Sequence, residues 1–193
     1  GVVLVRGEAG IGKSALLAAA VAAAPPHLRV LRCRGLEADT AVPFLALTEL
    51  LTPVADAVEE LEPFRAAVLR GALGLGPPAP ADPLAIWSAC LGVLDVASAT
   101  TPLVVVIDDA HWVDGPSLEV LAFVARRLAA DAGSVTLLAA SRDNPPNPLL
   151  QSNLPELRLG PLSRDSARRL VTSVADLAEA DVVFRQQPQQ GNR

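Results

Sequence analysis

Uninterrupted apolar runs recur along the chain, and each of them predicts a buried strand. Residues 1–5 (GVVLV) and 103–107 (LVVVI) contain no polar side chain, which is typical of parallel strands covered on both faces. A third strand of this kind is predicted over residues 134–141. A partly alternating run at 27–33 and a short run at 156–159 complete a set of five predicted strands.

Segments with apolar residues at helical spacing lie between and after these strands. They cover residues 15–24, 44–60, 63–73, 84–97, 114–130 and 163–174. We expect Pro53 to divide or kink the segment 44–60, because proline lacks a backbone N–H and clashes with the preceding turn. Strands that alternate with helices predict an α/β fold in three layers, with a parallel sheet between two layers of helices.

The first predicted strand leads into a glycine-rich loop of the pattern G-x-x-x-x-G-K-S, which is followed by a helix. The loop consists of Gly7, Glu8, Ala9, Gly10, Ile11, Gly12, Lys13 and Ser14. Its glycines permit close approach of the backbone, so that N–H groups and the helix N-terminus face phosphate oxygens. Lys13 is expected to bridge the outer phosphates, and the Ser14 hydroxyl to ligate Mg²⁺. We expect Arg6, just before the loop, to be an exposed charge at the strand end.

Two further strands end in polar residues that suit the same chemistry. Asp108 and Asp109 follow the strand 103–107, and Arg142 follows the strand 134–141. Ligands bind at the carboxyl ends of parallel strands, so we expect Asp108 to hold Mg²⁺, directly or through water, and Asp109 to polarise the attacking water. Arg142 is expected to contact the γ-phosphate. His111 is open to two interpretations, as a γ-phosphate sensor or as a structural residue.

Composition narrows the class of protein. The 193 residues are 51% hydrophobic with a net charge of −5, which argues against disorder and against a broad basic surface for nucleic acid. No apolar stretch approaches the ~20 residues of a membrane helix, and two cysteines with no metal-type spacing suit a reduced, cytoplasmic setting. Because the sequence contains no methionine, we expect the chain to be part of a longer protein.

The glycine loop at 7–14, the run 104–109 with its continuation DDAHWVD, and the Ser-Arg pair at 141–142 resemble the ATPase domain of AAA+-related signal-transduction NTPases. The similarity is greatest to the N-terminal ATP-binding module of large LuxR-type transcriptional regulators. It implies a P-loop NTPase core over residues 1–160, with five parallel strands in the order 5-1-4-3-2. It also implies that residues 161–193 begin a helical lid that is truncated here.

The same resemblance implies a function and its partners. ATP with Mg²⁺ is the expected ligand, and the domain is expected to act as a switch that responds to a regulatory ligand or protein. Asp109 stands where many motor proteins of the AAA+ group have glutamate, so slow hydrolysis is expected. DNA binding would belong to a C-terminal domain of a longer parent protein. Two alternatives are an AAA+ motor or loader of the replication-initiator type, and a vestigial interaction fragment that does not hydrolyse ATP.

Overall fold

The computed structural model describes residues 1–77, 82–130, 133–166 and 168–169. The chain divides into two units, Gly1–Leu159 and Gly160–Arg193. The first unit contains the sheet and its helices. In the second, Ser163 begins a helical turn at 164–166, and its hydroxyl accepts a hydrogen bond from the Ser166 N–H at 3.1 Å. The remainder of the helix expected at 163–174 lies largely outside the described residues, as does the end of the expected lid.

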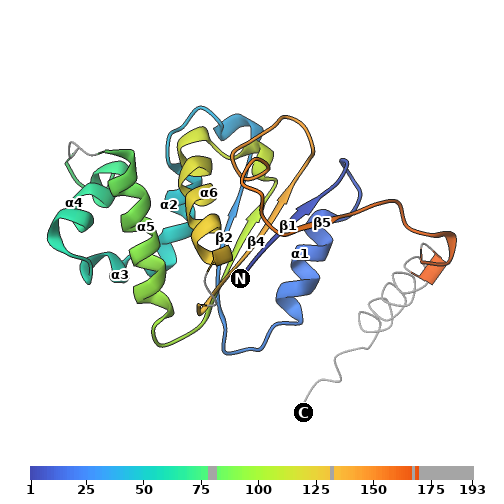
Figure 1. Cartoon of the computed structure of the whole chain (residues 1–193), viewed down its shortest axis with the longest axis horizontal. Coiled ribbons are helices and arrows are strands. Elements are labelled where there is room, and N and C mark those ends of the chain that lie inside the picture. Colours follow the sequence, from blue (N-terminus) through green and yellow to red (C-terminus); the bar gives the residue numbers. More distant parts are fainter. Residues whose placement is uncertain (78–81, 131–132, 167, 170–193) are drawn as a thin grey trace, which may run out of the picture. The chain divides into compact units, whose positions relative to one another are not determined.

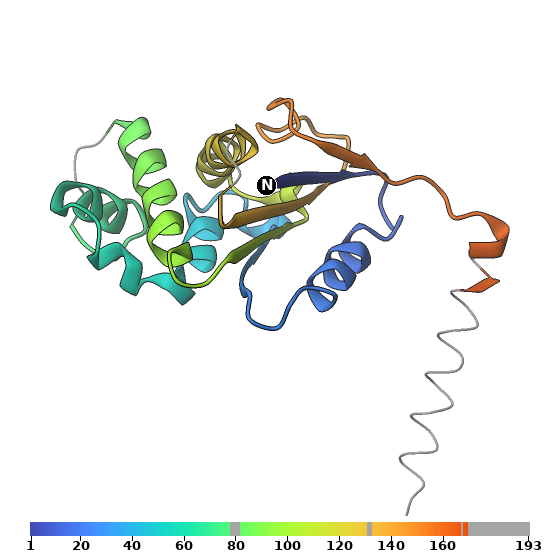
Figure 2. The same ribbon diagram turned by 60° about the horizontal axis from the view of Figure 1, so that its bottom comes forward.

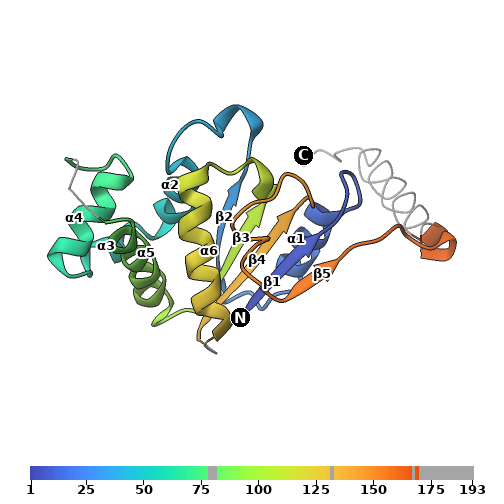
Figure 3. The same ribbon diagram turned by 45° about the horizontal axis from the view of Figure 1, so that its top comes forward.

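Five parallel strands form one sheet in the order β2-β3-β4-β1-β5 (Figure 3). The strands are β1 (Val2–Arg6), β2 (Arg29–Arg34), β3 (Leu103–Asp108), β4 (Val135–Ser141) and β5 (Glu156–Arg158). Read from the other edge, this is the order 5-1-4-3-2, so the predicted topology of a P-loop NTPase is confirmed. All neighbours run parallel, and every strand therefore ends at the same edge of the sheet.

Helices cover both faces of this sheet (Figures 1 and 2). They are α1 (Lys13–Ala22), α2 (Leu45–Leu51), α3 (Asp56–Glu59), α4 (Pro63–Ala72), α5 (Pro83–Ser98) and α6 (Gly115–Ala130). Helix α1 packs on one face, against β3 and β4, while α2, α5 and α6 pack on the other. The three layers expected from the sequence are thus present.

The larger core lies between the sheet and the α2–α5–α6 layer. Alternate strand residues such as Leu4, Val105 and Leu137 are fully buried there, and α3 and α4 extend the same core through Val58 and Leu69. The second core is smaller and lies under α1. It contains strand residues of the opposite parity, as the two-residue period of a strand requires, and they pack against Leu17 of α1; the strand residues are Val5, Val104, Val106 and Ala140.

Local sequence accounts for several helix boundaries. Glu62 and Asp82 cap α4 and α5, because their carboxylates accept hydrogen bonds from N–H groups of the first turn, and a proline follows each cap. Pro53 lies in a 3₁₀ turn between α2 and α3, which confirms the expected division of that segment. Within the described residues, no helix is long and apolar enough to span a membrane.

One local prediction is wrong. The Arg6 side chain is only 18% exposed, because its guanidinium forms ion pairs with Asp143 at 3.0 Å and Glu156 at 2.7 Å. The hydrogen bond to Glu156 raises the pKa of Arg6, against the opposing effect of burial. Arg6, at the end of β1, therefore pairs with the segment after β4 and with the first residue of β5 instead of extending into solvent.

Candidate functional site

The loop between β1 and α1 owes its shape to its glycines. Gly10 and Gly12 have φ of +74° and +103°, a region that side chains disfavour, and the space around both is open. Gly12 precedes the first residue of α1, Lys13, so the helix begins two residues earlier than expected. Gly7 serves packing instead, since a Cβ there would lie 2.9 Å from the Leu159 carbonyl oxygen.

The Lys13 side chain is hydrogen-bonded to the backbone at the start of the loop. Its side chain is buried to 7% exposure, and Nζ donates hydrogen bonds to the carbonyl oxygens of Gly7 at 2.8 Å and Glu8 at 2.7 Å. Burial lowers the pKa of Lys13, and the charge of Arg142 adds to this effect, while Asp109 and Asp108 oppose it. The ammonium group is thus fixed in position, with one of its three N–H donors left for a ligand.

Ser14 and Asp108 are brought together by the fold. The Ser14 hydroxyl donates to Oδ1 of Asp108 at 3.0 Å, across 94 residues of sequence, and the same oxygen accepts the Asp109 N–H at 2.9 Å. The two residues predicted to share a metal ion are therefore direct neighbours. A hydroxyl beside a carboxylate supplies two oxygen ligands of the kind that Mg²⁺ prefers.

Asp109 is held by an arginine that the sequence did not single out. Arg34, the last residue of β2, donates from Nε at 3.1 Å and from Nη2 at 2.9 Å to the single oxygen Oδ2 of Asp109. The hydrogen bond raises the pKa of Arg34, although its side chain is 62% exposed. Asp109 itself has φ of +48°, a strained conformation for a residue with a Cβ. Strain at a strand end is common at functional sites.

Arg142 completes a cavity of about 240 Å³ above the loop. The cavity is lined by Ala9, Gly10, Gly12, Lys13, Ser14, Ala15, Asp109 and Arg142. Two cations, open loop backbone and a helix N-terminus suit a polyphosphate. In the described part of the chain no group of three His, Cys, Asp or Glu side chains could hold a metal alone. The Ser14 hydroxyl and the Asp108 carboxylate, 3.0 Å apart, are oxygen ligands that fit a Mg²⁺ ion completed by phosphate oxygens or water.

His111 lies in the 3₁₀ turn Ala110–Trp112 that follows β3, where the charges of Arg142, Lys13 and the two aspartates act on it. Its side chain is buried, and neither ring nitrogen has a hydrogen-bond partner among the described residues. Burial lowers the pKa of His111, with Arg142 as the next cause. As a structural residue, His111 would be expected to form hydrogen bonds, but its ring nitrogens have no partner in the described chain.

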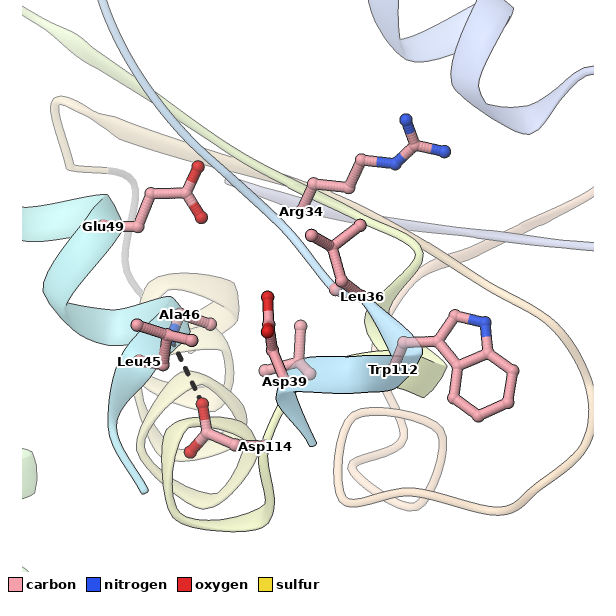
Figure 4. Close-up of a pocket in the computed structure, with 10 residues that line it drawn as sticks. Arg34, Leu36, Asp39, Leu45, Ala46, Glu49, Trp112 and Asp114 are labelled. Atoms are coloured by element: carbon pink, nitrogen blue, oxygen red, sulfur yellow. Dashed lines mark hydrogen bonds between the residues drawn. The ribbon is translucent and has the colours of Figure 1, made fainter. Parts of the chain in front are cut away.

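Residues 108–114, which contain three aspartates, form the acidic turn. Asp114 connects this acidic turn to α2. Its carboxylate, 2% exposed, accepts the N–H groups of Phe44 at 2.8 Å, Ala46 at 3.2 Å and Ser117 at 2.9 Å. It thereby caps α6 and fixes the start of α2 at once (Figure 4). Sequence patterns identified Asp114 only as the start of a helix.

A small cavity of about 20 Å³ adjoins this connection, between the end of β2, α2 and the acidic turn. Gly35 lines it, and a Cβ at Gly35 would lie 2.4 Å from the Asp109 carbonyl oxygen and 2.6 Å from the Val113 nitrogen. The backbone directly after β2 therefore passes against the acidic turn at a point where only glycine fits. This close passage places Arg34 beside Asp109.

The fold, the loop and the two acids define this protein as a P-loop NTPase. A family model for the AAA ATPase domain matches residues 1–138, and the chain belongs to that family. Membership implies use of a nucleotide, usually with Mg²⁺. No significant match was found among curated proteins.

Two solved structures are similar to the chain at low sequence identity. The chain is similar to the ORC1 protein of Aeropyrum pernix in complex with DNA, with 16% identity, a TM-score of 0.47, and coverage of 90% of this chain and 43% of that one. It is also similar to Drosophila ORC bound to AT-rich DNA and Cdc6, with 17% identity, a TM-score of 0.46, and coverage of 97% and 58%. The chain thus spans about half the length of these two structures.

Proposed function

We propose that this domain is an ATP-binding switch that hydrolyses ATP slowly and serves a bacterial signal-transduction protein of the LuxR-type regulator group. The observation that carries the proposal is the contact between Ser14 and Asp108, beside the buried ammonium of Lys13. The DDAHWVD run at 108–114 supports the signal-transduction subclass. The upstream signal would be a regulatory ligand or a protein partner.

Each residue has a defined part in this proposal. Lys13 and the loop N–H groups bind the phosphates, and Ser14 with Asp108 hold Mg²⁺, which neutralises phosphate charge when bound. Asp109 orients the attacking water and accepts its proton at a carboxylate oxygen. Arg142 contacts the terminal phosphate with its planar guanidinium. Slow turnover is expected because Arg34 already occupies Oδ2 of Asp109.

Titration of a fluorescent ATP analogue, with and without Mg²⁺, tests the proposal directly. We expect Mg²⁺-dependent binding that ATP competes better than GTP. Absence of binding would favour the vestigial interaction fragment.

Rapid hydrolysis with ATP-driven oligomerisation would favour the motor or loader alternative. That alternative needs an arginine that acts across subunits, whereas Arg126 bonds to Ser152 and Arg127 lies over the Phe123 ring within this chain.

Substitution Asp109→Asn is expected to keep ATP affinity within about twofold and to lower the hydrolysis rate by roughly 10²-fold or more, because an amide cannot accept the proton from water. Steady-state phosphate release and equilibrium titration measure the two effects separately. Equal turnover in the two proteins would remove Asp109 from the proposed chemistry.

Substitution Arg34→Gln is expected to raise the hydrolysis rate severalfold at unchanged ATP affinity, because it releases Oδ2 of Asp109. Arg32→Gln is the matched control: Arg32 is an exposed arginine two positions earlier on the same strand. An unchanged rate would show that the ion pair does not limit hydrolysis, and a lower rate would show that it holds Asp109 in its working position.

A further inference from the structure

His111 is an unexplained buried polar group beside the phosphate cavity. It is 6% exposed, and both Nδ1 and Nε2 lack a hydrogen-bond partner among the described residues. A buried polar atom without a partner destabilises the folded state, so an apolar side chain at this position would be favoured by stability alone. Such exceptions in a well-packed fold point to a functional use.

The location of His111 identifies what it can act on. The 3₁₀ turn that carries it follows β3 and packs against β4, the strand that leads to Arg142. Arg142 lines the cavity beside Gly12 and Lys13. Its guanidinium forms no ion pair or hydrogen bond with the other described residues. An unpaired donor group and an unpaired acceptor group thus occupy the ends of adjacent strands.

Charge favours a pairing in which the imidazole is neutral. The charged groups that act on His111 are Arg142, Lys13, Asp109 and Asp108, and burial together with the two cations lowers the pKa of His111. A neutral imidazole has one nitrogen that accepts a hydrogen bond, while a guanidinium has five N–H donors spread over two edges. Arg142 can therefore donate to a phosphate through one edge and to His111 through another.

We propose that His111 is a positioning residue for Arg142: its imidazole accepts a hydrogen bond from the guanidinium and orients it toward the terminal phosphate of the nucleotide. The inference rests on the proposed function, since it names how that site distinguishes a triphosphate from a diphosphate. His111 itself does not touch the nucleotide. His111 therefore contributes to nucleotide affinity only when Arg142 has a γ-phosphate to contact.

The experiment is a double-mutant cycle on nucleotide affinity. ATP and ADP, each with Mg²⁺, are titrated against the unmodified chain, His111→Leu, Arg142→Gln and the double variant. We expect His111→Leu to weaken ATP binding about tenfold and to leave ADP affinity unchanged. In the Arg142→Gln background the same substitution is expected to have no further effect. His111→Gln or His111→Asn, which restore an acceptor, are expected to recover part of the preference for ATP.

Stability provides the readout that separates this role from a structural one. His111→Leu is expected to unfold at the same temperature as the unmodified chain or at a higher one, because it removes an unpaired buried polar group. Equal loss of ATP and ADP affinity with a lower melting temperature would overturn the inference. An equal ATP effect of His111→Leu with and without Arg142 would also overturn it. If the unmodified chain bound neither nucleotide, the proposed function itself would be wrong.

Discussion

Replacing Lys13 by alanine is expected to lower the affinity for ATP roughly 100-fold, since a charge-assisted hydrogen bond contributes up to about 3 kcal/mol. The structure adds a second reason. Nζ donates hydrogen bonds to the carbonyl oxygens of both Gly7 and Glu8. Its loss therefore also removes a constraint on the conformation of the phosphate-binding loop.

Lys13→Met is a useful companion, because it keeps the apolar stem and removes only the ammonium. Isothermal titration calorimetry with MgATP gives the affinities, and thermal unfolding shows whether the fold is kept. Removal of an exposed cation far from the cavity, as in Arg29→Ala, controls for net charge. Unchanged affinity in Lys13→Met would contradict the assignment of the loop as the phosphate site.

Substitution Asp114→Ala is expected to reduce the free energy of unfolding by about 4 kcal/mol. The substitution leaves three N–H groups without an acceptor, two of them buried and one partly buried, and a buried one costs about 1–3 kcal/mol. They belong to Phe44, Ala46 and Ser117, so both α2 and α6 lose their N-terminal support. Chemical denaturation followed by circular dichroism measures the change.

Two further variants serve as controls for the loss of stability in Asp114→Ala. Glu119→Ala removes an exposed carboxylate from the same helix and is expected to change stability by less than about 0.5 kcal/mol. Asp114→Asn keeps one acceptor oxygen and is expected to fall between the two alanine variants. If Asp114→Ala were as stable as Glu119→Ala, the carboxylate would not be the connection between α2 and the acidic turn.

The sequence was sufficient to predict the sheet, because its strands are encoded locally. Residues 103–107 have no polar position, which leaves no face for solvent, and the loop 7–14 has a spacing that few other structures share. The proximity of Ser14 to Asp108 was also predictable, since parallel strands end at one edge of the sheet. Boundaries were less accurate: α1 begins at Lys13, because the helix starts inside the motif.

What could not be predicted depends on pairs that are distant along the chain. Arg34 and Asp109 are 75 residues apart, and their ion pair depends on the register that sets Arg34 opposite Asp108. Arg6 was expected to be exposed, but its two acidic partners are more than 130 residues away. The residues around Arg34 and around Arg6 do not indicate these ion pairs, because charged residues are common at the ends of strands whether or not they form ion pairs.

The position of the lysine has a chemical consequence. The chain has one lysine among sixteen cationic side chains, and it lines the phosphate cavity. Because burial lowers the pKa of Lys13, a larger share of its amine is nucleophilic at a given pH than for an exposed lysine. An acylating reagent therefore has a single ε-amine to modify, and a nucleotide in the cavity would shield it. Acylation of this amine, followed by mass spectrometry, thus reports occupancy of the site without an engineered label.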